Sequence, residues 1–136
     1  MKIKQKILIT TFAFVCATTP VFAQQAIYTV ADGKLNASEL TYDFYDDSLY
    51  CVNVKVGHVT DIILHQGENF IGAIGGDTAR WLIDKARIGN VTHVYIKPLV
   101  SSARTDIIIN TDKRSYHFLV TATDYYNPIV SFNFPE

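Results

Sequence analysis

The chain has 136 residues, with 12 basic and 13 acidic side chains and a formal net charge of −1 at pH 7. A chain of this length fits one domain. The nearly balanced charge excludes the strongly basic surface that neutralises phosphates, so no direct contact with nucleic acid is expected.

Residues 1–23 have the organisation of a secretory signal peptide. Three lysines precede a short apolar stretch at residues 7–15, and a Val-Phe-Ala sequence ends at Ala23. The stretch of about nine apolar residues is much shorter than the roughly 20 that span a bilayer, which disfavours the alternative of a retained membrane anchor. We therefore expect cleavage after Ala23 and export to a bacterial periplasm.

Removal of residues 1–23 leaves 113 residues, with nine basic and 13 acidic side chains and a net charge of −4. A domain of this size buries about two-thirds of its unfolded surface, so it needs neither a metal nor a disulfide to fold. Cys51 is then the single cysteine of the exported chain. It is either a small, half-buried strand residue or the partner of a disulfide to another protein or a second copy.

Residues 24–47 are acidic and irregular, and they predict a partly ordered segment before the main domain. Within it, residues 38–40 allow one helical turn and residues 39–45 allow an edge strand. From residue 48 to residue 136 the sequence predicts the domain itself. Its first strand, at 49–56, places Tyr50, Val52, Val54 and Val56 on one face.

Strands are predicted through the rest of the domain at 59–65, 68–74, 80–86, 92–97, 105–110, 115–123 and 129–134. Gln and Gly at 66–67 predict a hairpin, and residues 75–77 predict a tight turn with positive φ angles. Residues 87–90 predict a loop, and the polar residues 111–114 predict a second hairpin. About eight strands at this spacing predict an all-β fold, an antiparallel β-sandwich.

Alternation also predicts which side chains face the core. The inward sets are Ile62 and Leu64; Trp81 and Ile83; Val94 and Ile96; Tyr116, Phe118 and Val120; and Val130, Phe132 and Phe134. The adjacent Tyr125 and Tyr126 lie in a polar turn and point to opposite sides. Either at least one is exposed for a protein contact, or the pair covers the end of the sheet.

The residues with reactive side chains do not predict a catalytic, cofactor-binding or metal site. The histidines, His58, His65, His93 and His117, show no close pair and no accompanying cysteine pair. The carboxylates considered are Asp61, Asp77, Asp106 and Asp112. Two of these lie in turns, where Asp caps the backbone. We expect a protein that is not an enzyme.

Several blocks in order resemble the TrbG family of conjugal transfer proteins, to which the ninth VirB protein of type IV secretion systems also belongs. The blocks are Tyr50 to Glu68, Gly75 to Trp81, Thr92 to Pro98 and Thr111 to His117, followed by 126–128 and 130–135. The resemblance covers roughly residues 49–135, which are most of the exported chain. It corresponds to the N-terminal domain of that family.

The resemblance implies a structural subunit of the periplasmic part of the outer-membrane core complex. The partners it implies are other copies of the chain in a ring and the TrbI-like channel protein, which is the tenth VirB protein. Family members continue into a second β domain that binds a small outer-membrane lipoprotein, whereas this sequence stops at Glu136. The resemblance therefore implies a shortened or divided subunit. The alternative is a standalone periplasmic binding module or a regulator of secretion-complex assembly.

Overall fold

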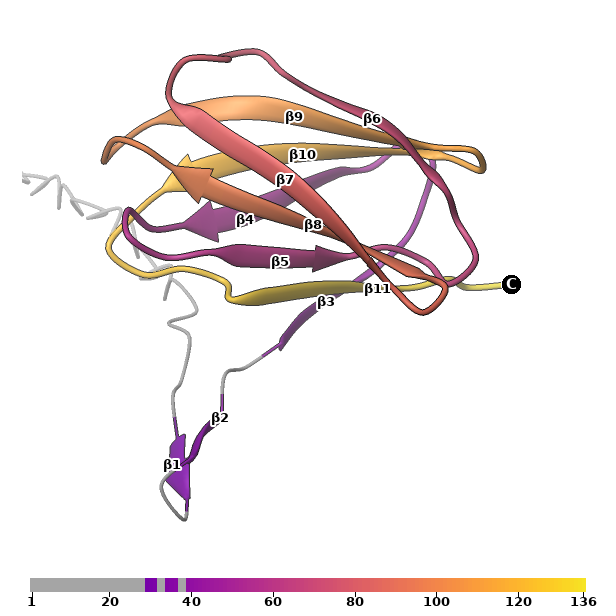
Figure 1. Cartoon of the computed structure of the whole chain (residues 1–136), viewed down its shortest axis with the longest axis horizontal. Helices are drawn as coiled ribbons and strands as arrows, with labels where there is room; N and C mark the ends of the chain where they lie inside the picture. The colour runs from indigo at the N-terminus through magenta and orange to yellow at the C-terminus, as the bar shows by residue number, and fades with distance from the viewer. Residues whose placement is uncertain (1–28, 32–33, 37–38) are drawn as a thin grey trace, which may run out of the picture.

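The chain forms a sandwich of two β-sheets. The computed structural model describes residues 29–31, 34–36 and 39–136, and in these residues two sheets of four and five strands face each other (Figure 1). β1 (Thr29–Ala31) and β2 (Lys34–Asn36) form a separate two-stranded sheet. The predicted signal peptide at 1–23 lies outside the described residues. The all-β sandwich is confirmed.

The order of the strands differs from their order in the sequence. The four-stranded sheet contains, in spatial order, β4 (Leu49–Val54), β10 (Ser115–Ala122), β9 (Arg104–Thr111) and β6 (Phe70–Gly75). The five-stranded sheet contains β3 (Glu39–Asp43), β11 (Ile129–Asn133), β5 (Thr60–Ile63), β8 (Val91–Pro98) and β7 (Trp81–Ile88). β3 lies within residues 39–45, for which the sequence allows an edge strand.

Both sheets are mixed, whereas the sequence predicts antiparallel ones. β4 pairs in parallel with β10, and β11 pairs in parallel with both β3 and β5. The other pairs within the sandwich are antiparallel. Alternation fixes which face a side chain takes and says nothing about the direction of the neighbouring strand, which explains the difference.

Two segments that the sequence predicts as turns lead from one sheet to the other and do not join adjacent strands of one sheet. β5 and β6 belong to different sheets, so the predicted hairpin at 66–67 is wrong, although Gly67 does have a positive φ of 83°. The segment after β6 likewise crosses to β7 in the other sheet. There Gly75 and Gly76 lack the predicted positive φ. Glycine is favoured at position 76 because a side chain has little room there: an added Cβ would lie only 3.2 Å from Thr105 Oγ1.

The hairpin predicted at 111–114 is confirmed, because β9 and β10 are antiparallel neighbours joined by these residues. Thr111 Oγ1 accepts from the backbone N–H groups of Lys113 at 3.2 Å and Arg114 at 3.1 Å. The loop predicted at 87–90 is shorter in the structure. β7 extends to Ile88 and β8 begins at Val91, and Gly89 turns the chain with φ 62°.

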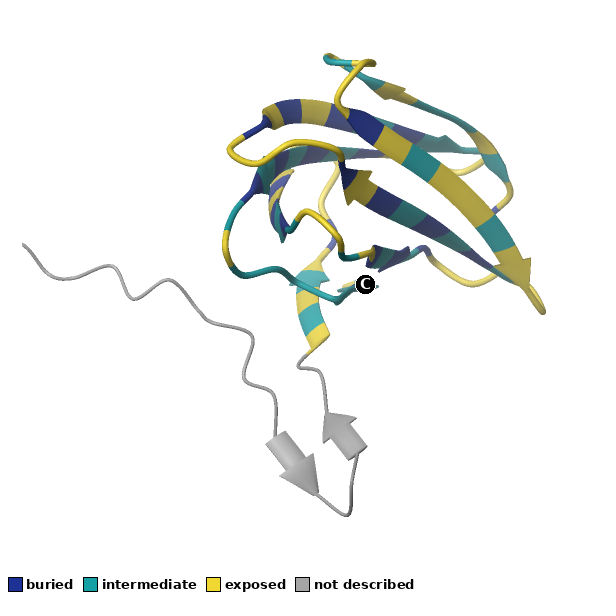
Figure 2. Cartoon of the chain, turned by 60° about the vertical axis from the view of Figure 1, so that its left-hand side comes forward, coloured by how far each residue is buried: buried dark blue, intermediate teal, exposed yellow. Residues whose placement is uncertain are grey.

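The core lies between the sheets, where buried and exposed residues alternate along most strands (Figure 2). Its buried apolar residues include Tyr50, Val52, Val54, Ile62, Leu64, Trp81, Val94, Ile96, Tyr116, Phe118, Val120 and Val130, as predicted. Ile83, Phe132 and Phe134 pack against this core while partly buried. Val56 is exposed, contrary to prediction, because β4 ends at Val54 and the chain turns at 56–57.

Candidate interaction surfaces

A row of three apolar residues and His117 crosses the outer face of the four-stranded sheet. The strand register places Leu49 beside His117, His117 beside Ile108, and Ile108 beside Ile74. The two ends of the row are the most open, since Leu49 is 57% exposed and Ile74 is 65% exposed. An apolar row that spans a whole sheet on its solvent side is typical of a surface that another protein covers.

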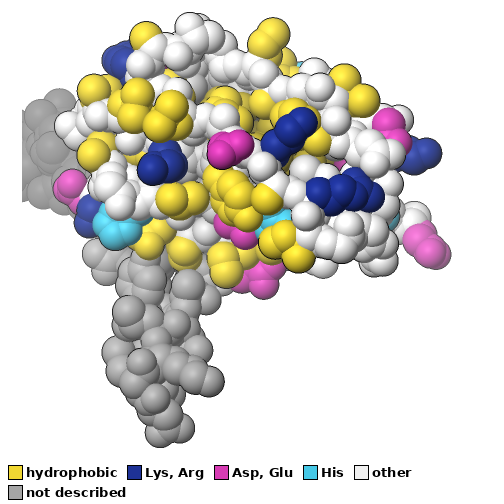
Figure 3. All heavy atoms as spheres, viewed as in Figure 1, with side chains coloured by type: hydrophobic (Ala, Val, Ile, Leu, Met, Phe, Trp, Pro, Cys, Tyr) yellow, Lys and Arg dark blue, Asp and Glu magenta, His cyan; other side chains and the backbone are white. Residues whose placement is uncertain are grey.

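The outer face of the five-stranded sheet is also partly apolar. Leu82 and Ile88 of β7 are exposed there. On the neighbouring strands, His93 Nδ1 lies 3.0 Å from both carboxylate oxygens of Asp61. In the view of Figure 3, apolar side chains are spread over the surface, with single charged groups between them. Neither sheet therefore has a uniformly polar outer face.

Three loops enclose a pocket of about 390 Å³ at one end of the sandwich. It is lined by the last residue of β10 and by residues from the β4–β5, β8–β9 and β10–β11 connections: Ala122, Lys55, Val56, Ser101, Ser102, Thr123, Asp124 and Tyr125. Tyr125 and Tyr126 are both half-buried, which favours the alternative that the pair covers the end of the sheet over the alternative of an exposed tyrosine. The ring of Tyr126 lies 4.5 Å from that of His58, which keeps it against the loops.

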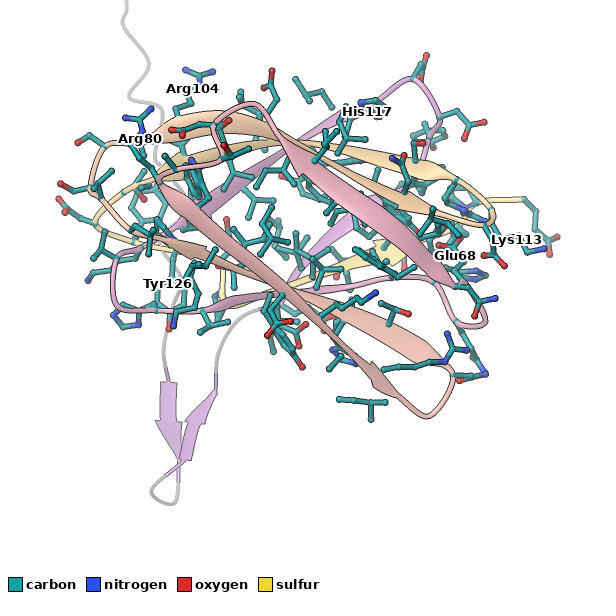
Figure 4. The ribbon with its side chains drawn as sticks, turned by 45° about the horizontal axis from the view of Figure 1, so that its top comes forward. Glu68, Arg80, Arg104, Lys113, His117 and Tyr126 are labelled. Atoms are coloured by element: carbon teal, nitrogen blue, oxygen red, sulfur yellow. The ribbon has the colours of Figure 1, made fainter. Side chains whose placement is uncertain are left out.

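The opposite end holds a buried carboxylate that the sequence does not reveal. Glu68 is 1% exposed, and its Oε2 accepts a hydrogen bond of 2.8 Å from the hydroxyl of Tyr116. Arg114 Nε forms an ion pair with the other oxygen, Oε1, at 2.5 Å. The Nε–H bond does not point at Oε1, so the contact is not a hydrogen bond. Figure 4 shows Glu68 at the end of the sandwich that carries Lys113, with Arg80 and Tyr126 at the other end.

This cluster is structural in its chemistry. Burial, followed by the hydrogen bond to Glu68, raises the pKa of Tyr116 far above its usual value, so the phenol stays protonated. The guanidinium of Arg114 also lies over the rings of Phe44 and Phe134, 4.9 Å and 4.3 Å from their centroids. The cluster therefore ties the β9–β10 hairpin to the segments before β4 and after β11.

The remaining acidic residues considered in the sequence lie apart. Asp77 accepts from the N–H of Ala79 at 3.1 Å and pairs with Arg80, so it caps the turn after β6 as expected. Its hydrogen bond to Arg80 lowers the pKa of the Asp77 carboxyl. Asp112 lies beyond the other end of β6, bonded to Asn69. Asp106 is exposed on the outer face of β9.

The four histidines lie in different places. His117 is on the outer face of the four-stranded sheet, His93 is on that of the five-stranded sheet, and His58 and His65 are in loops, the latter with its ring 4.1 Å from Phe134. In the part of the chain that the structure describes, no three His, Cys, Asp or Glu residues come together as metal ligands would. Cys51 is exposed on the edge strand β4, contrary to the half-buried alternative.

Replacement of Asp112 with Asn should destabilise the protein at neutral pH and much less in acid. The backbone N–H and the side-chain amide of Asn69, each at 2.9 Å, lower the pKa of the Asp112 carboxyl from its usual 3.8. A carboxyl with a lowered pKa in the folded state stabilises the fold above the unfolded value, and this contribution is lost as pH falls through the folded value. Urea titrations of both proteins at pH 7 and about pH 3 measure the difference. A gap that stays constant between the two pH values contradicts the prediction.

Comparison with known proteins shows the family of the chain that carries these surfaces. The family model CagX, described as a conjugal transfer protein, matches residues 38–136, which include the whole sandwich. The chain belongs to this family. It is also 31% identical over 83 residues to the probable conjugal transfer protein TrbG of Sinorhizobium fredii, in a match that covers 57% of this chain and 31% of that relative. The chain thus spans about a third of that relative's length.

These matches confirm the predicted resemblance to TrbG-like conjugal transfer proteins. The family match begins at residue 38, directly before β3, and so it includes the edge strand that completes the five-stranded sheet. Within the described residues there is no helix of the length and apolarity that crossing a bilayer requires.

Proposed function

We propose that this chain is a structural subunit of the periplasmic part of a conjugal transfer channel, in the core complex of a type IV secretion system. The observation that carries the proposal is the family match over the whole sandwich, combined with exposed apolar residues on the outer faces of both sheets. A sandwich with one covered core and two partly apolar outer faces is suited to binding neighbours on both sides.

The partners proposed for these faces are further copies of the chain and the TrbI-like channel protein, with a small outer-membrane lipoprotein as a partner of the wider assembly. No catalytic role is proposed, because the buried Glu68 is neutralised by Arg114 and the capping carboxylates of Asp77 and Asp112 lie at opposite ends of β6. Localisation in the periplasm is part of the same proposal.

Deletion of the gene followed by measurement of plasmid transfer tests the function. Transfer should collapse on deletion and return with the unchanged gene. A gene carrying Leu49→Asp and Ile74→Asp should fail to restore it, because these substitutions place charge at both ends of the apolar row. Lys113→Glu, at the tip of the β9–β10 hairpin, is the control and should restore transfer.

If the variants melt at the same temperature as the unchanged protein, the loss of plasmid transfer comes from the altered surface and not from unfolding. Normal transfer after deletion would reject the structural role. If overproduction then inhibits transfer, the alternative of an assembly regulator is favoured.

A further inference from the structure

A pocket that contains two cations lies between the edge strands of the two sheets. β6 is an edge of the four-stranded sheet and β7 is an edge of the five-stranded sheet. The pocket has a volume of about 270 Å³, and residues from the start of β6, the second half of β7 and the start of β8 surround it. Its lining residues are Asn69, Phe70, Lys85, Ala86, Arg87 and Thr92.

The guanidinium of Arg87 is held in place by neutral groups. One of its terminal nitrogens, NH1, donates to the carbonyl of Glu68 and to Oδ1 of Asn69, at 3.1 Å in both cases. The amide of Asn69 is itself fixed by Asp112, which accepts from Nδ2 at 2.9 Å. A guanidinium has five N–H donors in a planar fork, so most of the donors of Arg87 are still available to an acceptor in the pocket.

The second cation is Lys85, whose Nζ lies 4.2 Å from the centroid of the Phe70 ring. This cation–π contact keeps the ammonium at the pocket without neutralising it. Within the described part of the chain, no carboxylate forms an ion pair with Lys85 or Arg87. Glu68 is paired with Arg114 instead. The pocket therefore presents two exposed positive charges that lack an anion.

The backbone beside the pocket is also open to a partner. Leu99 N–H donates to Arg80 O, so by alternation Ile83, Lys85 and Arg87 direct their N–H and C=O groups to the outer side of β7. The N–H of Lys85 is bonded within the chain, to Asp84 Oδ1 at 2.8 Å. None of the described strands pairs with this side of β7. A strand from another protein can therefore extend the sheet here.

The positions of the side chains define which strand fits. Residues that lie opposite one another in an antiparallel ladder project to the same face. Residues of an added strand opposite Lys85 and Arg87 would therefore point into the pocket. The residue between them would lie opposite Ala86 on the outer face of β7, where Leu82 and Ile88 are exposed. The fitting strand has acidic residues at alternate positions and an apolar residue between them.

We propose that β7 and this pocket bind an extended segment of another protein in which acidic and apolar residues alternate. The segment pairs in antiparallel fashion with the outer edge of β7, and two of its carboxylates enter the pocket beside Lys85 and Arg87. The proposal rests on the proposed structural role, for which it gives the chemistry of one partner contact.

A carboxylate fits the pocket better than a phosphate does. The fork of a guanidinium matches the two oxygens of a carboxylate. The one hydroxyl in the pocket, on Thr92, donates to the carbonyl of Glu68 at 3.4 Å, so it is not directed at an anion. The open strand beside the cations favours a peptide, because a free anion gains nothing from backbone pairing.

Binding of a fluorescent peptide to the purified full chain tests the site. The probe is Thr-Val-Glu-Val-Glu-Val-Thr, and the matched control, Thr-Val-Glu-Glu-Val-Val-Thr, has the same composition with adjacent acids. The probe should bind about tenfold more tightly or better at low salt, because the control directs one carboxylate to the outer face of β7, where Asp84 lies. Fluorescence anisotropy measures both affinities. Equal affinities would overturn the proposal.

Variants of the protein locate the binding. Lys85→Gln with Arg87→Gln should weaken probe binding by about tenfold or more. Arg104→Gln with Lys113→Gln removes the same charge at exposed positions elsewhere and should leave the affinity unchanged. Both variants should melt at the temperature of the original protein. An equal loss of affinity in the two variants would show that net charge, and not the pocket, attracts the peptide, and would overturn the proposal.

Modified probes and other ligands test the pairing. Methylation of the two Glu backbone nitrogens removes the N–H donors that face β7, so it should weaken binding by about tenfold or more. Unchanged affinity after methylation would overturn strand pairing. Binding of inorganic phosphate without binding of the probe would also overturn the proposal. Self-association that Lys85→Gln with Arg87→Gln abolishes, in a chain that does not bind the probe, would make a second copy the occupant and overturn it.

The transfer assay separates this site from the proposed function. A chain that does not bind the probe but whose deletion abolishes transfer rejects the site alone. A chain that binds the probe but whose deletion leaves transfer unchanged rejects the proposed function alone.

Discussion

Replacement of Trp81 with Ala should lower the free energy of unfolding by about 3–5 kcal/mol. Trp81 is 5% exposed at the start of β7 and belongs to the buried core. Truncation removes a large ring from packed surroundings and leaves a cavity. The loss is a large share of the roughly 5–15 kcal/mol that a domain of this kind has in total, so the variant should unfold at much lower urea concentration.

The adjacent residue supplies the control for this experiment. Leu82 is 52% exposed, so Leu82→Ala should change the free energy of unfolding by no more than about 0.5 kcal/mol. Trp81→Phe should retain most of the stability, since it keeps an aromatic ring in the core. A loss below about 1 kcal/mol for Trp81→Ala would show that the site collapses around the smaller side chain.

Replacement of Arg114 with Met should cost about 3 kcal/mol, the lower end of the range for breaking a buried ion pair. Glu68 would keep its hydrogen bond from Tyr116 and lose the positive charge beside Oε1. The lower end applies because the Arg114 side chain is partly exposed. Met preserves part of the contact that Arg114 makes with the rings of Phe44 and Phe134.

A double-mutant cycle isolates the charge in this pair. Glu68→Met combined with Arg114→Met should be more stable than Arg114→Met alone, because no buried charge then remains without its partner. Lys113→Met, at the exposed neighbouring position, is the control and should have almost no effect. A double variant no more stable than Arg114→Met would show that packing by Arg114, and not its charge, stabilises the cluster. Urea denaturation of the unchanged protein, Glu68→Met, Arg114→Met, the double variant and Lys113→Met provides the measurement.

Alternation in the sequence predicted well which face of each strand is buried, and it predicted poorly which strands pair with each other. The inward positions of β8 and β10 follow directly from the period of two, because every second side chain of a strand faces the same sheet surface. The hairpin predicted at 66–67 and the positive φ angles predicted at 75–77 were wrong, and both segments cross to the facing sheet. A glycine-containing turn serves equally well whether the next strand joins the same sheet or the facing one, so local sequence cannot separate the two cases.

The buried cluster was missed for a related reason. Glu68 follows a turn in the sequence, where an acidic residue normally faces water. Its burial depends on Arg114 and Tyr116, which come from a distant hairpin on another strand pair. A polar residue becomes acceptable in a core only when such partners surround it, and a single sequence does not show which residues meet. The interaction surfaces depend on strand register across three or four strands and were hidden for the same reason.

The parallel pairing of β3 and β5 with β11, and of β4 with β10, has a consequence for synthesis. The single strand neighbour of β3 is β11 and that of β4 is β10, so a growing polypeptide cannot complete the five-stranded sheet until residues near 129–133 have left the ribosome. Folds dominated by such distant pairings also form slowly, in milliseconds to seconds. Delayed closure would therefore keep the unpaired early strands exposed during synthesis.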